Sequence, residues 1–156
     1  MAVQLLRKKN YLEMIRNAAR GENYLFKNTY AQLEDREGDI TKNGALCSGK
    51  LVSSILYLNK LIHDMHVTVE GVEKDMCSSD WRQVQELTAG CVLTWEDGNG
   101  NLKTHIGFYV GDDQAISNNA EKGLPEQHHY TFGTTEQGEP KRKILSMYWH
   151  PVLEEE

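Results

Sequence analysis

The chain has 156 residues, of which 17 are basic and 23 acidic, and its formal net charge at pH 7 is −6. This length fits a single domain with one hydrophobic core, which is stable without disulfide bonds. The acidic balance argues against a general nucleic-acid-binding protein, because phosphate contacts call for a basic surface. We therefore expect one domain over residues 1–156, in which residues 1–21 form an N-terminal helical extension.

The cysteines are Cys47, Cys77 and Cys91, an odd number without CxxC spacing. Neither a disulfide framework nor a zinc knuckle is indicated, and we expect reduced thiols. The N-terminal segment has no apolar stretch of signal-peptide length, and no later window approaches the roughly 20 apolar residues of a membrane span. The sequence thus predicts no membrane partner and a protein that is cytoplasmic as made. Extracellular or periplasmic action would require lysis or a dedicated secretion system.

Residues 3–20 are predicted to form an amphipathic helix, because apolar residues such as Leu5 and Ile15 recur on one side of it. Residues 22–44 are polar and contain turn residues, among them the pair Asn43 and Gly44. Glycine and asparagine favour turns, so this segment should be a loop with at most short regular pieces.

The stretch 43–63 carries apolar residues at spacings of one, three and four, including Leu51, Ile55 and Leu58. This spacing predicts a core helix buried along one side. Cys47 falls in its first turn, where the amide groups lack intrahelical partners and carry partial positive charge. Such an environment favours a thiolate, so Cys47 is a candidate nucleophile. The alternative is a small, buried, apolar thiol without a chemical role.

After this helix the pattern changes from helical spacing to alternation. Residues 64–81 are expected to form a connection with at most a small strand or helical turn. From residue 87 onward, period-two alternation interrupted by turns predicts an antiparallel sheet. The predicted strands are 91–95, 103–110, 115–119 and 142–149, with turns at 97–101 and 111–114. Helices followed by strands predict an α+β fold.

His105 stands at the start of a predicted strand, where an imidazole is well placed to act as a base. Together with Cys47 it fits the nucleophile-plus-base arrangement of cysteine hydrolases. Such a base needs a polar group to orient it through its other ring nitrogen. The next predicted strand offers Ser117 and Asn118 for this role.

The turn between these two strands decides which of the two residues faces the base. A two-residue turn at residues 112–113 places Asn118 opposite Gly107, on the face of His105, whereas a three-residue turn selects Ser117. We expect Asn118, since an amide oxygen accepts a hydrogen bond from an imidazole without adding a charge. Ser117 remains the alternative.

The segments LCSG, LTAGCVLTWE and HIGFYVGDDQAISNN, in this order, resemble the NlpC family of papain-like cysteine peptidases and the related CHAP (cysteine, histidine-dependent amidohydrolase/peptidase) domains over residues 41–150. The resemblance implies a papain-like fold, with N-terminal helices and the nucleophile-bearing helix packed on a C-terminal antiparallel sheet. It implies Cys47 as nucleophile, His105 as base, and Ser117 or Asn118 as the orienting residue. It further implies hydrolysis of an amide bond through a thioester, most often in peptidoglycan peptides, without a metal or other cofactor.

The sequence departs from the family pattern at two positions. Leu46 stands where the family commonly has aspartate, and Cys91 stands where the strand signature usually reads Gly-Asp. Neither position carries the nucleophile or the base, so the departures bear on substrate preference. A tyrosine upstream of the nucleophile often lines such sites, which makes Tyr30 a candidate substrate-binding residue together with Ser48 and His128. No ligand spacing supports a metal site at the paired histidines 128–129.

Two other functions fit the same sequence. A non-catalytic module on this fold would bind peptide or glycan ligands without cleaving them, because a fold does not fix a function. A toxin or effector amidase, delivered by other machinery, would account for the missing export signal. The expected partner is a peptide or peptidoglycan fragment, and the sequence carries no indication of the oligomeric state.

Overall fold

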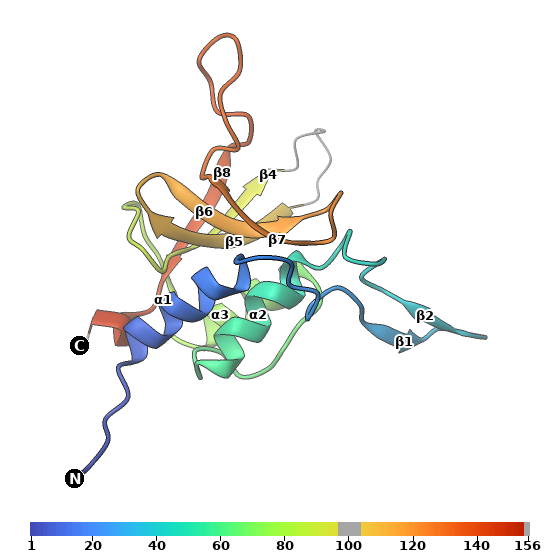
Figure 1. Cartoon of the computed structure of the whole chain (residues 1–156), viewed down its shortest axis with the longest axis horizontal. Helices are drawn as coiled ribbons and strands as arrows, with labels where there is room; N and C mark the ends of the chain where they lie inside the picture. Colours follow the sequence, from blue (N-terminus) through green and yellow to red (C-terminus); the bar gives the residue numbers. More distant parts are fainter. Residues whose placement is uncertain (97–103, 155–156) are drawn as a thin grey trace.

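The computed structural model describes residues 1–96 and 104–154. Six antiparallel strands form one sheet in the order β3-β8-β4-β5-β6-β7. Three helices lie together on one side of this sheet (Figure 1). The helices are α1 (Arg7–Ala18), α2 (Ser48–Leu58) and α3 (Val69–Ser78), and the strands of the sheet are β3 (Arg82–Gln83), β4 (Val92–Glu96), β5 (Thr104–Gly111), β6 (Gln114–Asn119), β7 (Leu124–His129) and β8 (Ile144–Trp149). The α+β class predicted from the sequence is confirmed.

The predicted core helix is α2, which packs against β5 and β6. Its residues Leu51, Ile55 and Leu56 are buried, and each such side chain contributes roughly 1.5–3 kcal/mol on leaving water. Leu58, expected in the same apolar stripe, is 64% exposed. The helix ends there in a left-handed turn, in which the Leu61 amide bonds back to the Leu56 carbonyl at 2.9 Å. This turn buries Leu61 in the core in place of Leu58.

The predicted N-terminal helix is present as α1 and is shorter than 3–20. Leu5, which the apolar pattern included, precedes the helix and is 77% exposed. Inside α1, Tyr11 and Ile15 are fully buried one helical turn apart, in the same core cluster as α2 and the sheet. The Tyr11 hydroxyl donates to the Gly90 carbonyl at 2.7 Å, which satisfies its polar end inside the core.

Elements α3 and β7 also differ from the sequence-based prediction. Residues 64–81 contain the full helix α3 and not only a connection. Its N-cap is Thr68, whose hydroxyl accepts from the Gly71 amide at 3.0 Å. Strand β7 falls outside every predicted strand, because Pro125 interrupts its pattern. Since β7 is at the edge of the sheet, a proline that cannot donate a hydrogen bond is tolerated there.

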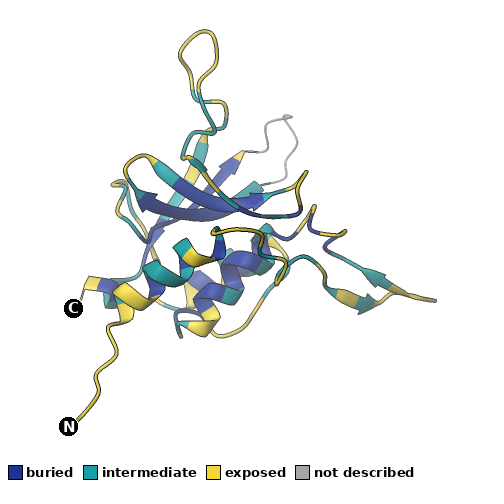
Figure 2. Ribbon diagram, in the orientation of Figure 1, coloured by how far each residue is buried: buried dark blue, intermediate teal, exposed yellow. Residues whose placement is uncertain are grey.

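The polar segment 22–44 contains two short strands, β1 (Tyr30–Gln32) and β2 (Glu37–Asp39), which form a separate antiparallel pair. The prediction of short regular pieces is confirmed. This pair projects from the body as an exposed arm, whereas the buried residues gather between the helices and the sheet (Figures 1 and 2). The predicted turn at 97–101 lies outside the described residues. Within the described ranges, no helix has the length and apolar character needed to cross a membrane.

Candidate functional site

Cys47 is the N-cap residue of α2 and is only 1% exposed. Its thiol donates to the Oδ1 atom of Asn118 on β6 at 3.0 Å, with the Gly44 carbonyl as a second acceptor at 3.4 Å. The Nδ2 group of Asn118 donates to the same Gly44 carbonyl at 2.8 Å. The start of α2, the loop just before it and the distant strand β6 are thus joined at the sulfur atom.

The loop before Cys47 is shaped by the carboxylate of Asp39. This carboxylate accepts from the backbone amides of Thr29 at 2.9 Å and Asn43 at 2.8 Å, and these bonds hold the pKa of Asp39 below its usual range. At Gly44, with φ of +90°, a Cβ atom would come within 2.3 Å of the Gly123 carbonyl oxygen. The Asn-Gly pair predicted to form a turn therefore also permits close contact with the turn between β6 and β7.

Burial raises the pKa of the Cys47 thiol to about 11. The helix-start amide and the charge of Lys50 act in the opposite direction and are outweighed. The thiol is therefore protonated at neutral pH in this structure. The expectation of a thiolate considered the helix start alone and left out the cost of burying a charge.

Ser117, not Asn118, faces the predicted base. In the ladder between β5 and β6, Ser117 pairs with Gly107 and its hydroxyl lies 2.8 Å from Nε2 of His105. The turn has two residues as expected, with Asp112 and Asp113 both left-handed. The register shifts at a bulge between Tyr109 and Gly111, and this extra residue moves the pairing from Asn118 to Ser117. Ser117, the alternative, therefore replaces Asn118 as the residue that orients His105.

The hydrogen bonds around Ser117 define the protonation of two histidines. His128 Nδ1 lies 2.7 Å from the His129 carbonyl, which only accepts, so Nδ1 carries the proton. His128 Nε2 must then accept from the Ser117 hydroxyl at 2.7 Å. The Ser117 oxygen then accepts a hydrogen bond from the Nε2–H group of His105. The second ring nitrogen of His105, Nδ1, keeps a free lone pair and has no hydrogen-bond partner among the described residues.

Ser117 and Asn118 are neighbours on β6, so their side chains point to opposite faces of the strand. Asn118 meets Cys47, while Ser117 meets His105 and His128. No hydrogen bond joins Cys47 to His105 in the described part of the chain. His105, Ser117 and His128 nevertheless line one groove of about 1280 Å³ together with Ser48 and Asn118, the neighbours of Cys47, whereas Cys47 itself does not line it.

The imidazoles in the groove are uncharged at neutral pH. Burial, followed by the charges of Arg142 and His128, lowers the pKa of His105 to about 3. Burial is also the main reason that the pKa of His128 is lowered. Phe132 stacks on His128 with ring centroids 4.1 Å apart, and Trp95 lies 5.6 Å from His105. His105 is thus a neutral imidazole in an aromatic pocket.

The other predicted substrate-binding residues separate into two groups. Ser48 and His128 line the groove, whereas Tyr30 is 72% exposed on the arm and does not line it. Phe132 and Arg142 are among the groove residues that were not predicted from the sequence. They come from the loop before β8 and follow no spacing that a motif would reveal. Within the described ranges, no three His, Cys, Asp or Glu side chains gather as metal ligands do.

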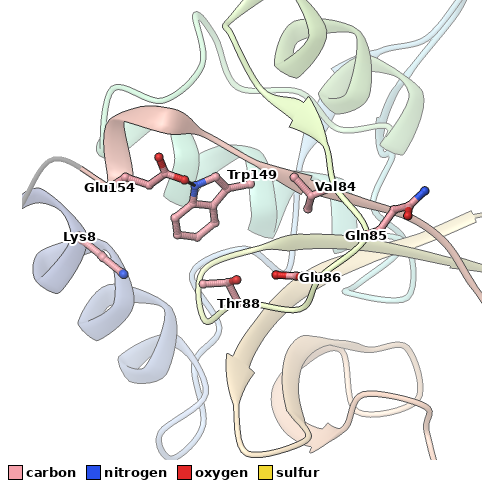
Figure 3. A pocket seen from close by; sticks show the side chains of 7 residues that line it. All are labelled: Lys8, Val84, Gln85, Glu86, Thr88, Trp149 and Glu154. Carbon is pink, nitrogen blue, oxygen red and sulfur yellow. Dashed lines mark hydrogen bonds between the residues drawn. The ribbon is translucent and has the colours of Figure 1, made fainter.

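A second cavity of about 460 Å³ lies between α1 and the segment before β4 (Figure 3). Its wall includes Trp149, whose indole N–H donates to Glu154 at 3.0 Å, and Lys8, whose ammonium lies 5.5 Å from the Trp149 ring centre. No cysteine or histidine lines it. The first groove, in contrast, is lined by His105 and by Ser48 and Asn118, the neighbours of Cys47.

Neither the protein-family models nor the curated proteins compared with this sequence give a match. The chemistry of the groove therefore follows from its own residues. These supply a neutral imidazole with a free lone pair and a hydroxyl that fixes the imidazole, and the buried Cys47 thiol lies next to the groove residue Asn118.

Proposed function

We propose that this protein is a cysteine-dependent hydrolase of papain-like fold, which cleaves an amide bond in a peptide, most often a peptidoglycan peptide. Cys47 is the nucleophile, His105 the base and Ser117 the residue that positions the base. The observation that carries this proposal is the shared groove. Ser48 and Asn118, which flank the Cys47 thiol, line the same groove as His105 and Ser117.

The reaction begins from a neutral thiol and a neutral imidazole. As the substrate enters, Sγ leaves Asn118 and transfers its proton to Nδ1 of His105, while Sγ forms a bond to the amide carbonyl carbon. Cys47 and His105 share no hydrogen bond in the described part of the free protein, so this step requires the substrate-bound state to bring Sγ and Nδ1 within hydrogen-bonding reach. The oxyanion accepts hydrogen bonds from backbone amides in the first turn of α2, where helical partners are lacking.

Three proton transfers complete the cycle. The carbon–nitrogen bond breaks, and the leaving amine takes the proton from His105. Water then attacks the thioester and gives one proton to His105, which returns it to the sulfur as the carboxylic product leaves. Throughout, the bond between Nε2 and Ser117 keeps Nδ1 as the basic nitrogen.

The test compares the wild type, Cys47→Ala and Cys77→Ala on purified peptidoglycan fragments and a peptide panel, with products identified by mass. Cys77 is an exposed free cysteine and does not line the groove, so it is the matched control. We expect cleavage by the wild type and Cys77→Ala and none by Cys47→Ala, with all three folded by circular dichroism. Full activity of Cys47→Ala would rule out the proposal.

One observation favours a second candidate, a peptide-binding module without turnover. The Cys47 thiol is 1% exposed and its pKa is raised to about 11, so the free protein holds no ready thiolate. Under this alternative, the same fragments bind equally well to the wild type, Cys47→Ala and His105→Ala, and no product forms. Under the hydrolase proposal, His105→Ala loses turnover by about 10²- to 10⁴-fold, the usual contribution of a general base.

A further inference from the structure

Ser117 lies between two imidazoles and forms a hydrogen bond with each of them. Its oxygen is 2.8 Å from Nε2 of His105 and 2.7 Å from Nε2 of His128. The other ring nitrogen of His128, Nδ1, lies 2.7 Å from the carbonyl oxygen of His129. One serine hydroxyl thus joins the two rings in a continuous chain of hydrogen bonds. Every bond in such a chain can reverse its direction when a proton is added at one end, because a hydroxyl both donates and accepts.

We propose that His128 is a positioning residue that acts through Ser117, and that it takes up the positive charge which the reaction would otherwise leave on His105. The role in turnover rests on the proposed hydrolase function. The coupling of the two imidazoles does not, because it can be observed without substrate.

The proposed step conserves every proton. Nδ1 of His105 takes the thiol proton, the proton on its Nε2 passes to the Ser117 oxygen, and the hydroxyl proton passes to Nε2 of His128. His105 is then neutral with its proton on Nδ1, while His128 is protonated on both ring nitrogens. When the leaving amine takes the proton from Nδ1, the other two protons return along the same path.

The surroundings of the two rings favour the charge on His128. Burial is the first cause of the low pKa of His105, about 3, so an imidazolium there is costly at neutral pH. Burial lowers the pKa of His128 as well, but the His129 carbonyl and the carboxylate of Glu126 act in the opposite direction. Phe132 also stacks on His128, with ring centroids 4.1 Å apart and planes at 22°, and an aromatic face attracts a cation.

The other charged groups around the two rings must be weighed against this. Arg142 lowers the pKa of both histidines, so its charge does not decide between them, and the imidazole of His129 lowers the pKa of His128. Further charged residues line the same groove from α3, the turn between β6 and β7 and the loop before β8, namely Glu70, Glu121 and Lys141. The preference for His128 therefore comes from Glu126, the carbonyl group of residue 129 and the ring of Phe132.

Acidification should reproduce the step without substrate, because water can supply the proton in place of the thiol. At neutral pH the hydrogen bonds place one proton on Nε2 of His105 and one on Nδ1 of His128. When the pair binds a further proton, His128 should become doubly protonated, and the single proton of His105 should move to Nδ1. Both changes should share one midpoint, since they belong to one coupled titration.

The experiment follows the nitrogen-15 shifts of the histidine rings in the substrate-free protein from neutral pH down to the onset of unfolding. Wild type should show the coupled change. Ser117→Ala breaks the chain, so His128 should gain its proton without a change of tautomer at His105. In His128→Gln the amide oxygen can still accept from Ser117 but cannot take up a proton, so His105 should keep its proton on Nε2.

His129→Gln is the matched control. This exposed side chain is one residue from His128 on β7 and is not among the described residues that line the groove. Its backbone carbonyl, which accepts from His128, is unaffected by the substitution. The coupled change and the wild-type kcat should both be retained.

Turnover gives a second readout. His128→Gln should lower kcat by about the same factor as Ser117→Ala, of the order of fivefold, because either change interrupts the same chain. The double variant should lose no more than either single variant. A residue that only held Ser117 in place could be replaced by glutamine without loss, so a wild-type kcat in His128→Gln would overturn the role in turnover.

Three results of the titration would overturn the coupling. His105 could keep its proton on Nε2 while His128 becomes charged, His105 could become doubly protonated first, or His128 could stay neutral until the chain unfolds. These outcomes are separate from those of the proposed function. If the coupled change occurs but the wild type cleaves no substrate, the hydrolase proposal fails and the coupled pair stands. If cleavage depends on Cys47 and the coupled change is absent, the hydrolase proposal stands and this inference fails.

Discussion

Cys47 and Asn118 are joined by a 3.0 Å hydrogen bond from the thiol to the amide oxygen, which links the start of α2 to β6. The same Asn118 side chain donates to the Gly44 carbonyl. Asn118 is thus a link between helix, loop and strand. Its contacts explain why an amide, with both an acceptor and a donor, occupies this buried position.

Asn118→Ala should lower the free energy of unfolding by about 1–3 kcal/mol, because the Gly44 carbonyl loses its donor in a buried setting. Urea unfolding measures this loss. The thiol also loses its nearer acceptor, keeps only the Gly44 carbonyl at 3.4 Å and gains space, so Cys47 should react faster with iodoacetamide. Unchanged stability together with an unchanged alkylation rate would show that the link has no energetic role.

The pH dependence of Cys47 alkylation follows from its raised pKa. Only the thiolate reacts, and with a pKa of about 11 the thiolate fraction increases about tenfold per pH unit up to that value. We expect the rate at Cys47 to rise steadily between pH 7 and 10. Cys77, which is exposed, is the internal comparison when modified peptides are counted by mass spectrometry. A rate at Cys47 that levels off near pH 7 would contradict the buried, protonated state.

Ser117→Ala should lower kcat about fivefold, since it removes one hydrogen bond worth about 1 kcal/mol that holds His105. Nitrogen-15 chemical shifts of the histidine rings give a second readout. In the wild type, His105 should be protonated at Nε2 and not at Nδ1, and Ser117→Ala should allow both tautomers. A wild-type His105 protonated at Nδ1 would refute this hydrogen-bond network.

The sequence predicted the elements better than the contacts between them. The apolar spacing of Leu51 and Ile55 located α2, because burial of one side of a helix imposes that spacing. The partner of His105 depended on a single bulged residue between Tyr109 and Gly111, which no local pattern encodes. Burial by segments distant in sequence raises the pKa of Cys47. An argument from the helix start alone predicted a lowered pKa.

The stability of the protein should fall from pH 6.5 downward, earlier than its carboxylates alone would cause. His105 has a folded-state pKa of about 3 and an unfolded value near 6.5, so between these values the unfolded chain binds more protons. The free energy of unfolding then decreases as pH falls, by up to about 1.4 kcal/mol per pH unit. The lowered pKa values of Asp39 and Asp75 add a loss only below about pH 4.

Urea unfolding at pH 7, 5.5 and 4.5 checks this expectation. His105→Gln removes the titrating group while keeping a donor for Ser117, so its stability should vary less over this range than that of the wild type. His128 also has a lowered pKa, so part of the pH dependence of stability should remain in His105→Gln. Parallel pH curves for the wild type and His105→Gln would contradict the low pKa of His105.

Gly107 keeps β5 and β6 close at the place where Ser117 meets His105. A Cβ atom at position 107 would lie 2.6 Å from the Ile116 carbonyl oxygen and 2.7 Å from the Ser117 Cβ. Backbone atoms cannot rotate away, so Gly107→Ala must separate the strands. We expect a loss of about 1–3 kcal/mol in the free energy of unfolding, the usual cost of overpacking.

The displacement of β6 should also change the surroundings of His105, because Ser117 moves with this strand. Gly107→Ala should change the nitrogen-15 shifts of His105, whereas Gly138→Ala should leave them as they are. Gly138 is a fair control, since a Cβ there meets nothing within 4 Å and the cost comes only from its φ of +82°. If both variants lose stability but neither changes the His105 shifts, the position of Ser117 does not depend on the close contact at Gly107.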